Sequence, residues 1–153
     1  MNKLITFISI ISLSVSAMAF DSVQAGKLNK FYSHLTQQNL ANSKLTVDGE
    51  SVMKMLREKK DFILLDVRTK GETTVISLVT DNSVKIPLEN LFEAKNLKKL
   101  PTDKPIVVVC HSGARALLAS MGLKQIGFKN IHLLKGGIAA LAVANSVKNA
   151  PLK

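Results

Sequence analysis

The feature that most constrains the fold is an alternation, from Leu45 onward, of short apolar runs with longer amphipathic segments. Each apolar run has the length of a buried strand, and most are rich in Val, Ile and Leu. The predicted strands are residues 62–67, 84–86, 106–110 and 130–134. Helices are predicted for residues 50–58, 89–98, 114–126 and from Gly137 to about Ser146, whereas residues 69–82 are expected to be irregular. Apolar strands that alternate with helices indicate a parallel sheet covered on both faces, so we predict an α/β fold.

The length and the single cysteine narrow the class of protein further. With 153 residues, 46% of them hydrophobic, the chain is sufficient for one core of ordinary size and is too apolar to be disordered. The only cysteine, Cys110, has no second cysteine with which to form a disulfide and no Cys–His cluster with which to form a structural zinc site. Disulfide scaffolds and zinc modules are therefore excluded.

The net charge of +10 is spread along the chain. Paired lysines occur only at Lys59-Lys60 and Lys98-Lys99, and no aromatic residues alternate with them as they do in many nucleic-acid surfaces. We therefore expect no nucleic-acid partner. A spread positive charge instead favours the attraction of small anions.

The amino terminus has the pattern of an export signal. After Lys3, residues 4–20 carry no charge, and Ala17-Met18-Ala19 is the small-x-small pattern that precedes signal cleavage. We therefore predict a secretory signal at residues 1–19, a periplasmic or secreted mature protein, and no membrane attachment after cleavage. An uncleaved membrane anchor is the alternative.

The segment that follows the signal is polar. Residues 20–44 are expected to form a lead-in, in which Phe31 and Leu35, four residues apart, are compatible with a short helix. The folded domain is expected to occupy residues 45–148.

Cys110 lies where the clearest predicted strand ends and a helix begins. In parallel α/β sheets, ligands bind at this end of the strands. A turn that contains Gly113 directs backbone N–H groups toward the sulfur, and the helix amino terminus and Arg115 add positive charge. These surroundings favour the thiolate, and comparable cysteines have pKa values of about 3.5–7.5. The alternative interpretation is that Cys110 is only the small apolar end of a buried strand.

Four motifs, taken together with their order and spacing, are typical of one family. They are Asp66-Val67-Arg68 with Glu72, Ile86-Pro87-Leu88, the loop Cys-x-x-Gly-x-Arg at residues 110–115, and Leu134-Lys135-Gly136-Gly137-Ile138. On these motifs, most of residues 45–141 resembles the single-domain rhodaneses, which are sulfurtransferases. The resemblance implies a five-stranded parallel sheet with helices on both faces. It also implies that Cys110 takes sulfane sulfur from thiosulfate as a persulfide and passes it to a thiophilic acceptor such as cyanide.

The resemblance also implies a set of site residues and partners. Cys110 would be the catalytic nucleophile, and the substrate-binding residues would be His111, Ser112, Gly113, Ala114 and Arg115. The expected partners are a small anionic sulfur donor and either a small thiophilic acceptor or an acceptor protein. No metal or organic cofactor is expected, and the protein is expected to be a monomer. For Asp66 and Arg68, a strand-end ion pair is favoured over contact with the substrate.

Two segments depart from the family's pattern. Residues 78–83 replace a usual Gly-His-Ile-Pro-Gly-Ala stretch, and Leu141 stands where a Trp usually follows the paired glycines. Both departures concern the wall of the predicted pocket and the preference for an acceptor, and neither changes the cysteine loop.

The length of the loop separates sulfur transfer from phosphatase or arsenate reductase chemistry. The loop has six residues from Cys110 to Arg115, whereas the phosphatase relatives of the fold use a longer Cys-x-x-x-x-x-Arg loop that encloses a tetrahedral phosphate. A tighter ring of N–H groups suits a single terminal sulfur, so sulfur transfer is favoured. A non-enzymatic sulfane-sulfur carrier, or a rhodanese-like binding module, stays open as the alternative to an enzyme.

Overall fold

The computed structural model describes residues 20–146. The predicted signal at residues 1–19 and the last two residues of the predicted domain lie outside this range. The chain divides into two units, Met1–Leu35 and Thr36–Lys153, and each is described by itself. Within residues 20–146, no helix has both the length and the apolar character needed to cross a membrane.

The predicted polar lead-in contains two short helices. Helix α1 (Ser22–Tyr32) begins at Asp21, whose carboxylate accepts a hydrogen bond from the backbone N–H of Gln24 at 2.9 Å. Because α1 ends at Tyr32, Leu35 lies beyond it, and the expected Phe31–Leu35 pair does not share one helix. Helix α2 (Gln37–Asn42) belongs to the second unit.

The second unit is built on a five-stranded sheet in which every pairing is parallel, as predicted. Its strands are β1 (Thr46–Val47), β2 (Ile63–Asp66), β3 (Ser83–Lys85), β4 (Ile106–Val109) and β5 (Ile131–Leu134), in the order β1-β5-β4-β2-β3. Strand β4 is central because its four β-branched residues are all buried and pack well on both faces. The short edge strand β1 was expected only from the family resemblance, since two residues carry no periodic pattern.

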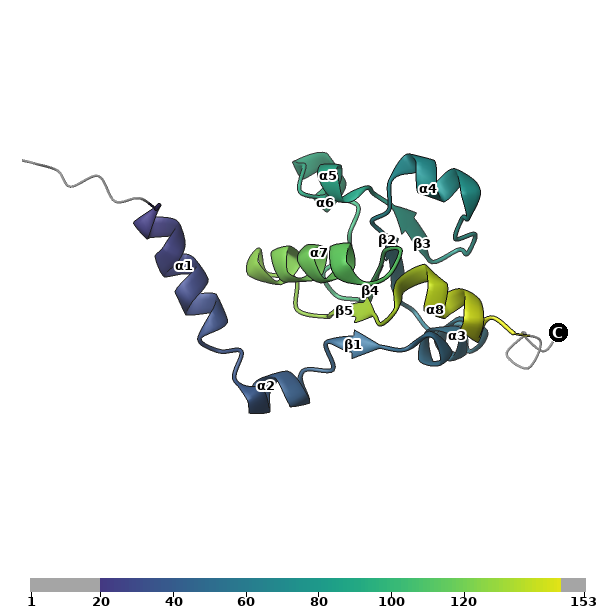
Figure 1. The fold of residues 1–153 in the computed structure, drawn as a ribbon, viewed down its shortest axis with the longest axis horizontal. Coiled ribbons are helices and arrows are strands. Elements are labelled where there is room, and N and C mark those ends of the chain that lie inside the picture. The colour runs from purple at the N-terminus through teal and green to yellow at the C-terminus, as the bar shows by residue number, and fades with distance from the viewer. Residues whose placement is uncertain (1–19, 147–153) are drawn as a thin grey trace, which may run out of the picture. The chain divides into compact units, whose positions relative to one another are not determined.

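Helices cover both faces of this sheet (Figure 1). On one face, Ile106 and Val108 of β4 pack in a cluster with residues of α7 (Ala114–Gln125) and Leu91. On the other face, Val107 and Val109 pack with residues of α3 (Gly49–Arg57) and α8 (Gly137–Ala144). The side chains of β4 thus alternate between two apolar layers, as the pleat of a strand requires.

Helix α4 (Lys70–Val75) lies in the segment that was expected to be irregular, so that expectation was wrong. Thr69 and Glu72 form a capping box: the Thr69 hydroxyl accepts from the backbone N–H of Glu72, and the Glu72 carboxylate accepts from that of Thr69. No residue of α4 is buried, which is why the segment lacks the apolar spacing of a core helix.

The helix predicted for residues 89–98 is divided into α5 (Leu88–Leu91) and α6 (Ala94–Leu97). In a continuous helix, the Asn90 carbonyl would accept a hydrogen bond from the backbone N–H of Ala94. It instead accepts one from the side chain of the buried Asn96, at 2.8 Å, and one from the N–H of Glu93. The side chain of Asn96 therefore stabilises the break between the two helices.

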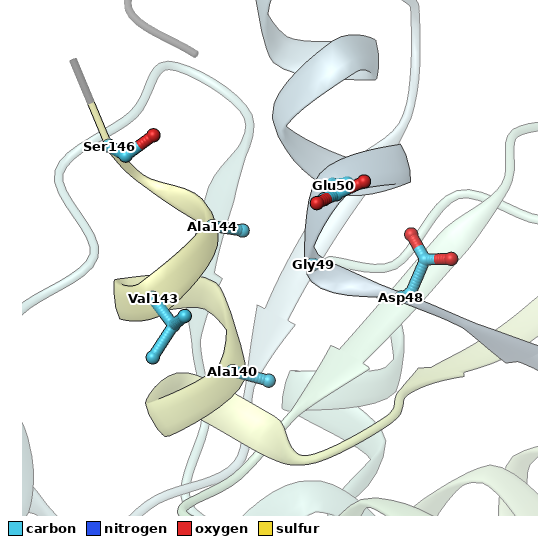
Figure 2. A pocket seen from close by; sticks show the side chains of 7 residues that line it. All are labelled: Asp48, Gly49, Glu50, Ala140, Val143, Ala144 and Ser146. Carbon is cyan, nitrogen blue, oxygen red and sulfur yellow. The ribbon is translucent and has the colours of Figure 1, made fainter. Parts of the chain in front are cut away.

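Helices α3 and α8 approach each other closely at Gly49 (Figure 2). A Cβ atom on Gly49 would lie 2.7 Å from the Ala140 carbonyl oxygen, and Figure 2 shows the methyl groups of Ala140 and Ala144 pointing toward α3. A hollow of about 640 Å³ lies at this crossing. Asp48 and Glu50 are its acidic residues, and Asp48 caps α3 by accepting from the N–H of Ser51 at 2.7 Å, so that carboxylate is already used in the fold.

Candidate active site

Cys110 follows the last residue of β4 and is 1% exposed. Its Sγ accepts a hydrogen bond from the backbone N–H of Gly113 at 3.0 Å. Gly113 is the N-cap residue of α7, so the sulfur lies at the positive end of that helix. The predicted strand–turn–helix arrangement around the cysteine is therefore present, and its backbone stabilises negative charge on sulfur.

Three glycines shape the loop and its support. Gly113, with φ +119°, turns the chain from the cysteine into α7. Gly136, the N-cap residue of α8, and Gly137, its first residue, have φ +76° and +61° and turn the chain from β5 into α8. A Cβ on Gly137 would collide with the carbonyl oxygens of Cys110 and His111, so only glycine fits there.

The first turn of α8 also holds the cysteine loop through a hydrogen bond. The backbone N–H of Ile138 donates to the Cys110 carbonyl at 2.8 Å. The paired glycines were identified from the sequence only as part of the family motif. Their role as the support beneath the loop follows from the tertiary structure.

The other predicted substrate-binding residues lie on or beside the same loop. His111, Ser112 and Ala114 are exposed, and Ala114 is the first residue of α7. His111 lines a neighbouring hollow. The structure therefore brings the six residues of the loop together at one end of β4.

Arg115 is paired with Glu72 of α4. Its two terminal nitrogens donate to the two carboxylate oxygens at 2.5 and 2.6 Å, and each side chain is about one-third exposed. The hydrogen bond from Arg115, supported by the backbone N–H of Thr69, holds the pKa of Glu72 well below its usual range. The same pairing raises the pKa of Arg115, with smaller contributions from the nearby Cys110 and Asp66.

This pairing changes the expected electrostatics of the loop. Because the pKa of Glu72 is lowered by folding, the ion pair stabilises the fold above the pKa of an unpaired glutamate and is lost as the pH falls through the folded-state value. At neutral pH, Arg115 therefore acts together with a carboxylate rather than as a lone positive charge. Glu72 was quoted in the family motif, but its contact with Arg115 was not predicted.

Asp66 and Arg68 form a second ion pair at the end of β2, as the sequence favoured. Arg68 Nη2 donates to Asp66 Oδ2 at 2.6 Å, and Arg68 Nε donates to Oδ1 at 2.9 Å. Asp66 is 0% and Arg68 is 3% exposed, so the charges are shielded from water and neutralise each other.

A hollow of about 330 Å³ lies beside the loop. Its lining consists of Arg68, Glu72, Val75, Ile76, His111, Ile138, Ala139 and Ala142. Among residues 20–146, no group of three or more His, Cys, Asp or Glu side chains is placed to hold a metal ion. The site brings together the sulfur of Cys110, a backbone N–H donor at the start of a helix and an adjoining hollow.

Comparisons with known proteins agree with this geometry. The model of the family "Rhodanese-like domain" matches residues 48–144. A sulfurtransferase from Allochromatium vinosum is 31% identical over 96 residues, which are 63% of this chain and 86% of that protein. A tRNA uridine(34) hydroxylase from Pelagibacter ubique is 36% identical over 105 residues. Those residues are 68% of this chain but only 33% of the hydroxylase, so the chain spans about a third of that protein.

Solved structures show the same fold. A rhodanese-related protein from Thermoplasma volcanium is 29% identical, with a TM-score of 0.55, over 65% of this chain and 92% of that one. The CoADR-RHD protein of Bacillus anthracis is 25% identical, with a TM-score of 0.57, over 70% of this chain and 18% of that one. The family model therefore spans the cysteine loop, and the solved structures share the fold.

Proposed function

Because this chain belongs to the rhodanese-like domain family, we propose that it moves sulfane sulfur from thiosulfate, or a similar anionic donor, to a thiophilic acceptor such as cyanide. The family and its sulfurtransferase relatives support sulfur transfer as the general activity. The observation that carries the finer proposal is the hydrogen bond from the Gly113 N–H to Cys110 Sγ at the start of α7.

The first half of the proposed reaction loads the cysteine. The Cys110 thiolate attacks the outer sulfur of thiosulfate, a new S–S bond forms, and sulfite leaves with the electron pair of the broken S–S bond. The product is a Cys110 persulfide that carries one negative charge. The Gly113 N–H donates to Cys110 Sγ at the amino terminus of α7, next to the outer sulfur on which that charge develops, and stabilisation of the charge lowers the barrier.

The second half of the reaction discharges the cysteine. Cyanide attacks the outer sulfur of the persulfide, thiocyanate leaves, and Cys110 is regenerated as the thiolate. Neither half requires a proton to be moved by a side chain. The exposed His111 is therefore assigned no role as a base.

A two-step assay tests this function. The protein is incubated with thiosulfate and examined by mass spectrometry, and we expect one added sulfur on the peptide that contains Cys110. Cyanide is then added, and thiocyanate should form in an amount equal to the loaded sulfur. No adduct would contradict the proposal. An adduct that cyanide does not discharge would instead favour the carrier, which passes its sulfur only to a protein.

The ion pair beside the loop gives a second prediction. We expect Arg115→Ala to raise the KM for thiosulfate by about tenfold, because a charge-assisted contact is lost and the Glu72 carboxylate is left to repel the dianion. Adding Glu72→Gln to that variant removes the repulsion, so the KM should fall again by about two- to fivefold. Steady-state kinetics at constant ionic strength measure both effects.

The control for this experiment is Lys54→Ala, which also removes one positive charge. Lys54 pairs with Glu58 on the surface of α3, and its side chain is 67% exposed. The KM of Lys54→Ala for thiosulfate should stay within about twofold of the KM of the unmodified protein. If Arg115→Ala behaved like Lys54→Ala, Arg115 would have no part in binding the donor.

The secretory signal predicted for residues 1–19 extends the proposed function to the location of the protein. With a cleaved signal, the sulfur transfer would take place in the periplasm or outside the cell, where thiols are readily oxidised. A single cysteine suits that environment, because no second thiol of the chain is present to convert the persulfide into a disulfide.

A further inference from the structure

Helix α7 exposes large apolar side chains to water. Its buried residues are mostly small: Ala116, Ala119, Ser120 and Leu123. Leu117 and Leu118, by contrast, are exposed, and no charged residue lies between Arg115 and Lys124. A helix that is apolar on all sides is usually covered on all sides. The exposed face of α7 therefore has the character of a surface that binds a partner.

Phe92 joins this exposed face to form one patch. Leu118, Gly122 and Ile126 are four residues apart, so they lie along one side of α7 and its C-cap. The ring of Phe92, at the end of α5, lies over Gly122, because a Cβ atom on Gly122 would collide with it. The α7 patch consists of four exposed side chains: Leu118 at 64%, Ile126 at 52%, Phe92 at 44% and Leu117 at 43%. Adjoining apolar side chains that are exposed in this way mark a site of interaction.

The α7 patch begins beside the cysteine loop. Ala114, the fifth residue of that loop, is exposed and lies one turn before Leu118 on α7. The backbone N–H of Leu117 donates to the carbonyl of Gly113 in the same loop, at 2.9 Å. A partner that covers the patch would therefore lie next to the loop that holds Cys110.

The end of the patch near Ile126 is positively charged. Residues 104–153 contain seven Lys or Arg and no Asp or Glu. The Nζ of Lys124, in the last turn of α7, donates to the carbonyl of Lys129 at 3.3 Å, so these two lysines lie together. In the described part of the chain, neither of them forms an ion pair.

The side of the patch near Phe92 adds to this positive charge. In the segment of α5 and α6, Glu93 is already paired with Lys95 at 2.8 Å. Lys98 and Lys99 follow α6 and are exposed, and Glu89 is the remaining acidic residue of the segment. Four lysines thus face one carboxylate that is not paired with a lysine, and the net charge beside the patch is positive.

This charge favours one kind of partner. A second copy of the chain would bring the lysines of both copies together, and like charges across an interface are unfavourable. A bilayer would extend over the whole surface, including Glu89, whereas a protein is able to contact the apolar side chains and the lysines selectively. We propose that the α7 patch is a docking surface for a protein that presents apolar side chains bordered by Asp and Glu. This proposal goes beyond sulfur transfer and does not depend on it.

A pair of synthetic helical peptides tests the proposal on the full chain. Both carry leucines at spacings of three and four, and their other positions are Glu in one peptide and Lys in its twin. We expect the Glu peptide to bind with a Kd of about 10–100 µM at low salt, and the Lys peptide to bind at least about tenfold more weakly. Fluorescence anisotropy of the labelled peptides measures both values. The Kd of the Glu peptide should rise by about fivefold in about 0.5 M salt.

Variants locate the binding on the patch. Leu118→Asn/Ile126→Asn should raise the Kd of the Glu peptide by about tenfold, because two exposed apolar contacts are lost. Lys129→Glu should raise it by about three- to fivefold and strengthen the binding of the Lys peptide. The matched control is Val79→Asn/Val143→Asn, whose side chains are 87% and 82% exposed and lie on neither α5 nor α7. It should leave the Kd within about twofold.

Each contrary outcome overturns the proposal. Equal binding of the two peptides, or binding that Leu118→Asn/Ile126→Asn leaves intact, would show that the patch does not recognise an acidic protein. A dimer in sedimentation velocity that this variant dissociates would assign the patch to a second copy. Binding to phosphatidylglycerol vesicles that the variant abolishes, with no binding of the Glu peptide, would assign it to a lipid surface. Because these measurements involve no sulfur, their failure is distinct from a failure of Cys110 to take sulfur from thiosulfate.

Discussion

Replacing Cys110 with serine is expected to abolish sulfur loading completely. Thiocyanate formation should fall by about 10³-fold or more, to the rate without protein, because a hydroxyl is far less nucleophilic than a thiolate and forms no S–S bond. The measurement is the mass of the protein after incubation with thiosulfate, followed by the cyanide assay. Cys110 is the only cysteine, so no other thiol in the chain is available to replace it.

The folded state of the Cys110→Ser variant must be shown separately. The change is nearly isosteric, and the serine hydroxyl is able to accept the hydrogen bond that the Gly113 N–H donates to Sγ. We expect the circular dichroism spectrum to be retained and the free energy of unfolding to fall by about 1 kcal/mol. A folded serine variant that still formed thiocyanate would show that the sulfur is not carried on residue 110.

The largest loss of stability is expected from Asp66→Asn. This change leaves the guanidinium of Arg68, which is 3% exposed, without its charged partner inside the sheet. Removing one partner of a buried ion pair costs about 3–5 kcal/mol, a large fraction of the 5–15 kcal/mol that stabilises a typical domain. Urea denaturation followed by circular dichroism measures the loss.

An exposed pair in the same domain is the matched control. Asp61 pairs with Lys104 at 2.8 Å, but its side chain is 72% exposed. Asp61→Asn should therefore cost less than about 1 kcal/mol. The double variant Asp66→Leu/Arg68→Met removes both buried charges and should be more stable than Asp66→Asn. Equal losses for Asp66→Asn and Asp61→Asn would contradict the assigned role of the buried pair.

Local sequence patterns predicted the central strands and the helix after the cysteine. The run Ile106–Val109 is buried on both faces because every residue in it is apolar and β-branched. Helix α7 was predicted to within one residue at its end, since Gly113 precedes it and Gly127, with φ +107°, follows it. These features depend on residues that are close together in the sequence, so the sequence alone predicts them.

Helix α4 could have been found but was not. The spacing of Thr69 and Glu72 is that of a capping box, which is a signal for the start of a helix. The segment was nevertheless expected to be irregular, and its β-branched residues Thr73, Thr74 and Val75, with no apolar stripe after the cap, give little other sign of a helix. Besides the capping box, α4 is stabilised by the contacts of Glu72 with the Thr69 hydroxyl and with Arg115, and not by a buried face.

The two segments that depart from the family's pattern acquired a location only in the structure. Leu78 and Val79, and the distant Leu141, line the same hollow. From the sequence, these residues indicated only that the wall of the predicted pocket differs from that of the family. Their common position became visible because the segment after α4 and the helix α8 lie on either side of one hollow.

By itself the sequence determined a parallel α/β sheet and the place of Cys110 at the end of its central strand, because strands, turns and helix starts depend on residues a few positions apart. Only the tertiary structure decided which charges meet and which residues line the hollow beside the cysteine loop. Glu72 and Arg115 are 43 residues apart, and nothing in the spacing of either one predicts their contact. That contact, like the lining of the hollow, depends on how α4, α7 and α8 pack around the sheet, which is a property of the whole core.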